Sequence, residues 1–123
     1  MTIKVAVVGA AGRMGATVCE AVEAAEDMEL TARLDAGDPI SSESLGGADV
    51  AVEFSVPSAS EANTLAILEA GADAVVGTTG WTEESLGRVR ETAERLGRSA
   101  VIAPNYALSA VLVMSFAEKA APY

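Results

Sequence analysis

Three glycines and one acidic side chain stand at a spacing that suits the binding of phosphate groups and a sugar. Gly9, Gly12 and Gly15 directly follow the apolar run Ile3–Val8. In such a loop the first glycine permits a tight turn, the second lets backbone amides approach a diphosphate, and the third allows a helix to pack closely on a strand. Asp35 follows about 20 residues later, where this fingerprint places an acid that binds an adenosine ribose. The pattern predicts a dinucleotide site.

The charges beside this loop bear on which dinucleotide it binds. Arg13 and the positive end of the following helix would both attract phosphate. The carboxylate of Asp35 would repel a 2′-phosphate, and Ala36 leaves no arginine directly after the acid, although Arg13 and Arg33 could partly compensate. The sequence therefore favours NAD(H) slightly over NADP(H). The alternative stays open that the glycines form only a structural turn and that Asp35 is a solvated loop residue.

Composition excludes several other functions. The 123 residues contain no histidine, which excludes a His-based metal site and a Ser-His-Asp arrangement within this sequence. A net charge of −10 disfavours nucleic acid and anionic membranes as partners. Cys19 is the only cysteine, so no internal disulfide can form. No apolar run reaches the length of a membrane span, and the start lacks the features of a signal peptide. We expect a cytoplasmic protein with an aliphatic core, since aromatic residues are only 4%.

Strands and helices alternate in the hydrophobic pattern. Glycine or capping residues separate the segments: Ser58 or Ser60 is expected to cap one helix, which ends at Gly71, and Thr82 caps the next, which ends at Gly97. Strands joined by helices through short loops imply right-handed crossovers. The sequence therefore predicts an α/β fold with a doubly wound, mainly parallel sheet of the Rossmann type. The expected strands are Ile3–Val8, Leu30–Leu34, Asp49–Phe54, Ala74–Val76 and Ala100–Ala103, and the first helix is Arg13–Ala25.

Four segments in a fixed order resemble a known family. They are GAAGRMG at 9–15, VEFSVP at 52–57, VVGTTGW at 75–81 and IAPNYALSAVL at 102–112. Together they resemble the N-terminal half of dihydrodipicolinate reductase, an NAD(P)H-dependent oxidoreductase of lysine and diaminopimelate biosynthesis. The glycine loop is generic, whereas the GTTG and APN motifs at these spacings are far more specific.

The resemblance implies a set of cofactor-binding residues. The loop after the first strand would wrap the diphosphate, Asp35 would hold the ribose, and Phe54 would lie beside the cofactor. The GTTG motif would line the nicotinamide end, and the APN motif would close the pocket beneath the ring. The remaining residues of this implied set are Gly9, Ala10, Ala11, Gly12, Arg13, Met14, Gly77, Thr78, Thr79, Ala103, Pro104, Asn105 and Tyr106.

The sequence also departs from the family. Members are about twice as long, and their second half carries a His-His-x-x-Lys motif with the proton donor. We therefore expect a dinucleotide-binding domain at 1–106, and at 107–123 the start of a helix leading into a substrate domain absent from this chain. No catalytic residue is then expected here, the small-molecule substrate would be bound through that domain, and homo-oligomers would belong to the full-length enzyme.

Two other interpretations remain open. One is a free-standing nucleotide-binding module or subunit that senses NADH/NAD. The other is a domain of the homoserine or aspartate-semialdehyde dehydrogenase type, since fold alone does not determine function.

Overall fold

The computed structural model describes residues 2–103, and that range contains five strands and three helices, which alternate except that the second strand is followed by the third with no helix between them. The strands form one parallel sheet in the order β2-β1-β3-β4-β5. The predicted α/β fold with a doubly wound parallel sheet is confirmed. In chain order the elements are β1 (Ile3–Val8), α1 (Arg13–Ala24), β2 (Met28–Leu34), β3 (Val50–Glu53), α2 (Pro57–Glu69), β4 (Asp73–Val76), α3 (Glu83–Leu96) and β5 (Ala100–Ile102).

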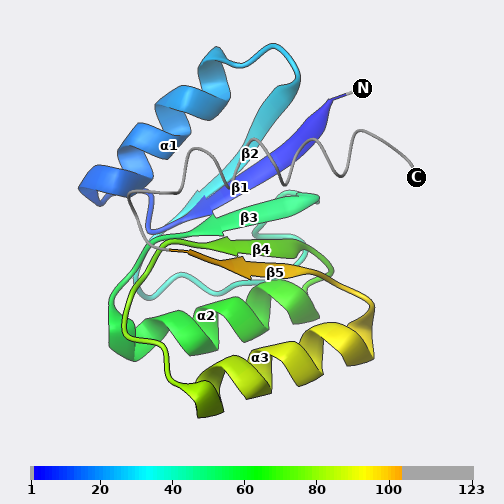
Figure 1. Cartoon of the computed structure of the whole chain (residues 1–123). Helices are drawn as coiled ribbons and strands as arrows, with labels where there is room; N and C mark the ends of the chain where they lie inside the picture. Colours follow the sequence, from blue (N-terminus) through cyan, green and yellow to red (C-terminus); the bar gives the residue numbers. More distant parts are fainter. Residues whose placement is uncertain (1, 104–123) are drawn as a thin grey trace.

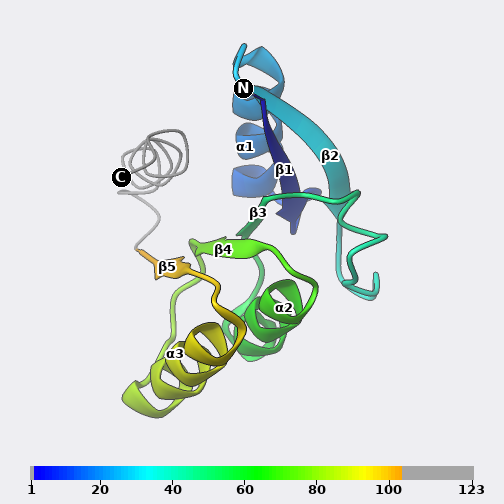
Figure 2. The ribbon, with the colours of Figure 1, turned by 90° about the vertical axis from the view of Figure 1, so that its right-hand side faces the viewer.

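The sheet separates two helical layers. Helix α1 covers one face beside β1 and β2, whereas α2 and α3 lie together on the other face (Figure 1, Figure 2). The chain leaves β1 in one direction to form β2 and then returns to form β3 on the other side of β1. In open parallel sheets, such a reversal of strand order opens a crevice at the carboxyl ends of the strands, where ligands bind. These ends lie at the left of Figure 1.

The core is aliphatic, as predicted. Along β1, Val5 and Val7 pack toward α1, whereas Ala6 and Val8 pack toward α2 and α3, because successive side chains of a strand point to opposite faces. No aromatic residue is among the buried hydrophobic residues of the described range. The lone Cys19 is a free thiol, buried in the α1 layer.

Helix boundaries follow the expected signals except at α2. Thr82 caps α3, and Gly97 ends it in the left-handed conformation with φ of 65°. The expected cap of α2 at Ser58 or Ser60 is wrong, since α2 begins at Pro57 after an N-cap at Val56. A proline at the first helical position is already set at a helical φ, so the helix starts there. None of the described helices is long and apolar enough to cross a membrane.

Candidate functional site

A cleft of about 410 Å³ lies where β1, β2 and β3 end. It is the place where the switch in strand order predicts a ligand. A hollow of about 580 Å³ also runs along β2, but it is lined by Glu23 and residues 28–33 and contains no part of the glycine loop. We therefore take the cleft as the candidate site. Its lining comprises Val8, Gly9, Gly12, Asp35, Ala36, Gly37, Asp38, Ile40, Phe54, Ser55, Val56, Ala59 and Asn63.

Two of the three loop glycines are required by the packing of the chain itself. Gly9 has a φ of 92°, and a Cβ there would lie 1.5 Å from the carbonyl oxygen of Phe54. A Cβ on Gly15 would lie 1.9 Å from the carbonyl oxygen of Gly9. Only glycine lets the loop pass this close to β3 and lets α1 pack against the loop. These are the turn and packing roles expected from the sequence.

Gly12 is different, because the protein leaves room for a side chain there. Its φ of −72° suits any residue, and among described atoms a Cβ would meet only the carbonyl oxygen of Gly9, at 3.4 Å. Gly12 is also the N-cap of α1, and no side chain in residues 2–103 accepts a hydrogen bond from the first turn. Free N–H groups and the positive helix end favour an anion at this point. The geometry fits a diphosphate approaching the backbone.

Asp35 lies in the cleft and is joined to the glycine loop. One carboxylate oxygen, Oδ1, accepts a hydrogen bond of 2.7 Å from the backbone N–H of Ala11. The N–H groups of Gly9 and Ala10 both donate to the carbonyl of Leu34, at 2.7 and 3.1 Å. A carboxylate accepts about four hydrogen bonds, so it keeps capacity for ribose hydroxyls.

The two arginines near the site differ in what they can bind. Arg13 is exposed at the first residue of α1 and forms no ion pair with any described residue. Arg33 instead donates to Glu23 at 2.7 Å, and this hydrogen bond raises the pKa of its guanidinium. Arg13 is thus available to a phosphate, whereas Arg33 already has an anionic partner.

The structure brings the predicted nicotinamide-side residues together only in part. The ring of Phe54 lies against Gly77, where a Cβ would be 2.2 Å from ring atom Cε1. Thr79 is exposed, whereas Thr78 is buried. The N–H of Ala103 donates to Val76 at 3.0 Å, which places Ala103 beside the end of β4. The predicted Pro104, Asn105, Tyr106 and the helix at 107–123 lie outside the described residues.

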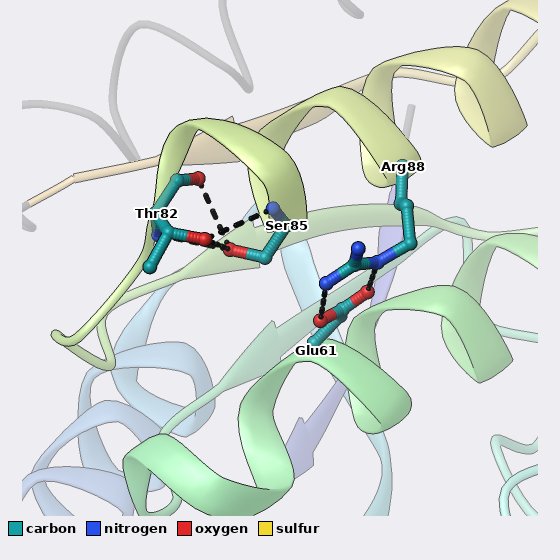
Figure 3. Close-up of polar contacts among 4 residues, drawn as sticks. All are labelled: Glu61, Thr82, Ser85 and Arg88. Atoms are coloured by element: carbon teal, nitrogen blue, oxygen red, sulfur yellow. Dashed lines mark hydrogen bonds and ion pairs between the residues drawn. The ribbon is translucent and has the colours of Figure 1, made fainter.

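Helix α3 fixes the far end of the loop after β4 (Figure 3). Thr82 Oγ1 accepts from the N–H of Ser85 at 3.1 Å, and Ser85 Oγ accepts from the N–H of Thr82 at 2.9 Å. One turn further along, Arg88 donates to both carboxylate oxygens of Glu61 on α2. The hydrogen bond from Arg88 lowers the pKa of Glu61. The loop is therefore held at a defined position relative to α2.

A buried carboxylate that the sequence reasoning missed lies under this region. Glu53, the last residue of β3, is fully buried. It accepts hydrogen bonds from four side chains, which are Ser55, Ser60, Asn63 and Thr78. A signal was present in the sequence: a charged residue inside an apolar strand segment, followed by polar residues three positions apart on the next helix. No group of three or more potential metal ligands occurs in residues 2–103.

The fold and this site define the class of the protein. A parallel sheet reverses its strand order beside a glycine loop, a helix with no side-chain cap follows the loop, and an acid directly follows the second strand. This is the arrangement of a Rossmann-type dinucleotide-binding domain, the kind that binds NAD(P)H.

Comparison with known proteins gives the family. Residues 3–106 match the family described as "Dihydrodipicolinate reductase, N-terminus". The chain belongs to this family, and the resemblance predicted from the four motifs is confirmed.

Individual relatives agree with this assignment. The 4-hydroxy-tetrahydrodipicolinate reductase of Beutenbergia cavernae is 56% identical over 124 aligned positions, covering 100% of this chain and 50% of that protein. The structure "Dipicolinate bound Dihydrodipicolinate reductase from Paenisporosarcina sp. TG-14" superposes with a TM-score of 0.73 at 31% identity, covering 100% of this chain and 55% of the other. The chain therefore spans about half the length of the curated relatives it matches.

The fold is also shared more widely. Homoserine dehydrogenase of S. aureus superposes with a TM-score of 0.64 at 15% identity, covering 83% of this chain and 32% of that one. At this identity the likeness shows the fold alone. The homoserine dehydrogenase alternative thus has support from architecture only.

Proposed function

We propose that this domain holds NAD(P)H along the carboxyl edge of its sheet for the reaction that its relatives' names state, the reduction of 4-hydroxy-tetrahydrodipicolinate. The single observation that carries the proposal is the free space beside the backbone of Gly12. The packing of the protein does not require glycine there, yet the position caps an otherwise uncapped helix beside the cleft. A cofactor diphosphate accounts for both facts.

The other residues of the site are proposed to contact the rest of the cofactor. Residues 9–14 would cradle the diphosphate, and Asp35 would accept from the adenosine ribose. Phe54 and residues 77–79 would surround the nicotinamide, and residues 103–106 would close the pocket beneath it. When bound, the cofactor supplies the hydride that reduces the dihydrodipicolinate-type ring. This chain's residues bind and orient the cofactor. We further propose that 1–106 form the cofactor domain and that 107–123 begin the connection to a substrate domain.

We propose NADH as the preferred cofactor. The ribose-side acid Asp35 lies in the cleft and would repel a 2′-phosphate. The nearby Arg33 is paired with Glu23 and is therefore less available to attract one. Arg13 is the remaining local cation, and its place at the start of α1 suits the diphosphate better than the ribose.

Titration calorimetry of the 123-residue chain with NADH and with NADPH tests both claims. We expect NADH to bind more tightly than NADPH. Asp35→Asn keeps an oxygen that can accept from Ala11 but removes the charge, so it should move the ratio of the two affinities toward NADPH by about tenfold. Failure of both cofactors to bind at millimolar concentration would overturn the site. An unchanged ratio in Asp35→Asn would overturn the role of the charge.

A reductase assay tests the proposal that this chain binds the cofactor but does not supply the proton donor. The sequence contains no histidine, and the family resemblance places the proton donor outside it. We expect the 123-residue chain to bind cofactor without measurable turnover, because the histidine to which the family resemblance assigns that proton is not in its sequence. Measurable reduction of the substrate by the purified chain would contradict this assignment.

A further inference from the structure

Glu53 is a charged residue in the middle of the protein with no cationic partner in the described range. It ends the central strand β3, and its exposed fraction is 0%. The ion pairs among residues 2–103 do not include it. Burying a carboxylate is unfavourable unless hydrogen bonds replace its hydration. Such a residue is expected to be kept for a purpose other than packing.

Four neutral donors supply those hydrogen bonds. Oε1 accepts from Ser60 Oγ at 2.8 Å and from Thr78 Oγ1 at 2.7 Å. Oε2 accepts from Asn63 Nδ2 at 3.0 Å and from Ser55 Oγ. Ser60 is in the first turn of α2, whose positive end also favours a negative charge nearby. Both oxygens of the carboxylate are therefore fully used by the protein itself.

The donors come from separate segments of the chain that the fold brings together. Ser55 belongs to the loop after β3, and Thr78 belongs to the loop after β4. Thr78 Oγ1 also accepts a hydrogen bond of 2.9 Å from the N–H of Ser55. The two loops are thus joined by one hydroxyl that donates to Glu53 and accepts from the neighbouring backbone.

These loops form the part of the edge that is proposed to hold the nicotinamide. Ser55 and Asn63, which both donate to Glu53, line the cleft. Phe54 directly follows Glu53, and its ring lies against Gly77, the residue before Thr78. The carboxylate lies beneath the surface that would meet the ring and has no exposure of its own.

We infer that Glu53 is a positioning residue for the nicotinamide half of the cofactor. By holding Ser55 and Thr78 together, it sets the relative position of the loops that carry Phe54 and Thr79. It acts through these residues and does not itself touch the ligand. The inference rests on the proposed function, and it predicts that loss of Glu53 weakens binding of the nicotinamide half while leaving binding of the adenosine half intact.

The experiment compares NADH with ADP-ribose, which lacks the nicotinamide. Their affinities are measured by calorimetry for the wild-type chain, Glu53→Gln and Val52→Ala. Glutamine keeps the shape of Glu53 but replaces one acceptor oxygen with a donor group, so two of the four donors lose their acceptor. Val52 is the preceding residue, also fully buried, and it packs in the opposite α1 layer away from the hydrogen bonds. Val52→Ala therefore controls for general destabilisation of β3.

We expect Glu53→Gln to weaken NADH binding about tenfold and to leave ADP-ribose binding within about twofold of the wild type. Val52→Ala should leave both affinities within the same twofold range. The fluorescence of bound NADH, which reports the surroundings of the reduced ring, should change in Glu53→Gln and not in Val52→Ala. An equal loss for both ligands, no loss for either, or equal wild-type affinities for NADH and ADP-ribose would overturn the inference. If the wild type bound neither ligand, the proposed function itself would be refuted.

A second pair of variants keeps the test valid if Glu53→Gln does not fold. Thr78→Val has nearly the same shape but lacks the hydroxyl that joins the two loops, whereas Thr78→Ser retains it. Thr78 is 6% exposed, so its side chain acts chiefly inside the protein. Thr78→Val should show the same selective loss of NADH affinity, and Thr78→Ser should restore it. Equal behaviour of the two variants would contradict the role of the hydroxyl network.

Discussion

Alanine substitution at Gly12 and Gly15 should separate ligand binding from folding within one loop. At Gly12 the backbone is extended, and the new methyl group would meet only an ordinary contact among described atoms. Alanine is a poorer N-cap than glycine, but it also reduces the freedom of the unfolded chain. The net change in the free energy of unfolding should stay within about 1 kcal/mol. The methyl group would, however, occupy the space proposed for the diphosphate, and NADH affinity should fall at least tenfold, or about 1.4 kcal/mol.

At Gly15 the expected effect is the reverse. The Cβ would lie 1.9 Å from the carbonyl oxygen of Gly9, whereas ordinary contacts begin near 3.4 Å. The backbone of α1 or of the loop must move by more than an ångström. Overpacking of this kind costs about 1–3 kcal/mol, which for a chain of this size lowers the Tm by about 4–12 °C.

Gly87→Ala is the matched control for both variants. Gly87 is exposed in α3, and apart from the neighbouring backbone of the helix no described atom lies within 4 Å of a Cβ built there. It should gain up to about 1 kcal/mol of stability from helix propensity and bind NADH normally. Thermal unfolding followed by circular dichroism and calorimetry with NADH measure the two properties. Wild-type NADH affinity in Gly12→Ala would refute the placement of the diphosphate, and a wild-type Tm in Gly15→Ala would refute the packing argument.

Two further variants test the contacts that hold α3. Thr82→Ala removes the capping box and should lower stability by about 1 kcal/mol; an unchanged Tm would mean that the box adds nothing. Glu61→Gln removes the ion pair with Arg88. Since Arg88 lowers the pKa of Glu61 below its ordinary 4.5, the pair stabilises the fold above that pH, and the stabilisation is lost as the pH falls through the lowered value. The Tm difference between wild type and Glu61→Gln should therefore shrink in acid, and a difference independent of pH would contradict this.

Local chemistry explains which parts of the fold were predictable. The cap at Thr82, the stop at Gly97 and the buried strand Ile3–Val8 depend on residues close in sequence, and each was correct. The predicted start of α2 is wrong because two local signals compete. The serines suggested a cap, whereas Pro57 started the helix, and the Ser60 hydroxyl instead donates to Glu53.

The candidate site likewise has parts that could be predicted from the sequence and parts that could not. The glycine loop and Asp35 follow a spacing rule, so their meeting in one cleft could be expected. The hydrogen bonds of Glu53 could not be predicted from the sequence, because one donor is 25 residues away. The order of the strands in the sheet brings that donor close to Glu53. Thr78 illustrates the difference. The sequence predicts its motif to line the cofactor, but only the structure shows that the Thr78 hydroxyl donates to the buried Glu53.

The proposed ribose-binding role of Asp35 is coupled to a structural one. Its oxygen already accepts from the N–H of Ala11 and so joins the end of β2 to the loop that begins α1. A substitution that removes both side-chain oxygens, such as Asp35→Ala, would also loosen that loop. Changes beside the acid, such as a new cation in place of Ala36 or release of Arg33 from Glu23, leave the hydrogen bond intact. The proposed cofactor preference can therefore change without loosening the loop, either through these neighbours or through Asp35→Asn, which keeps an acceptor oxygen.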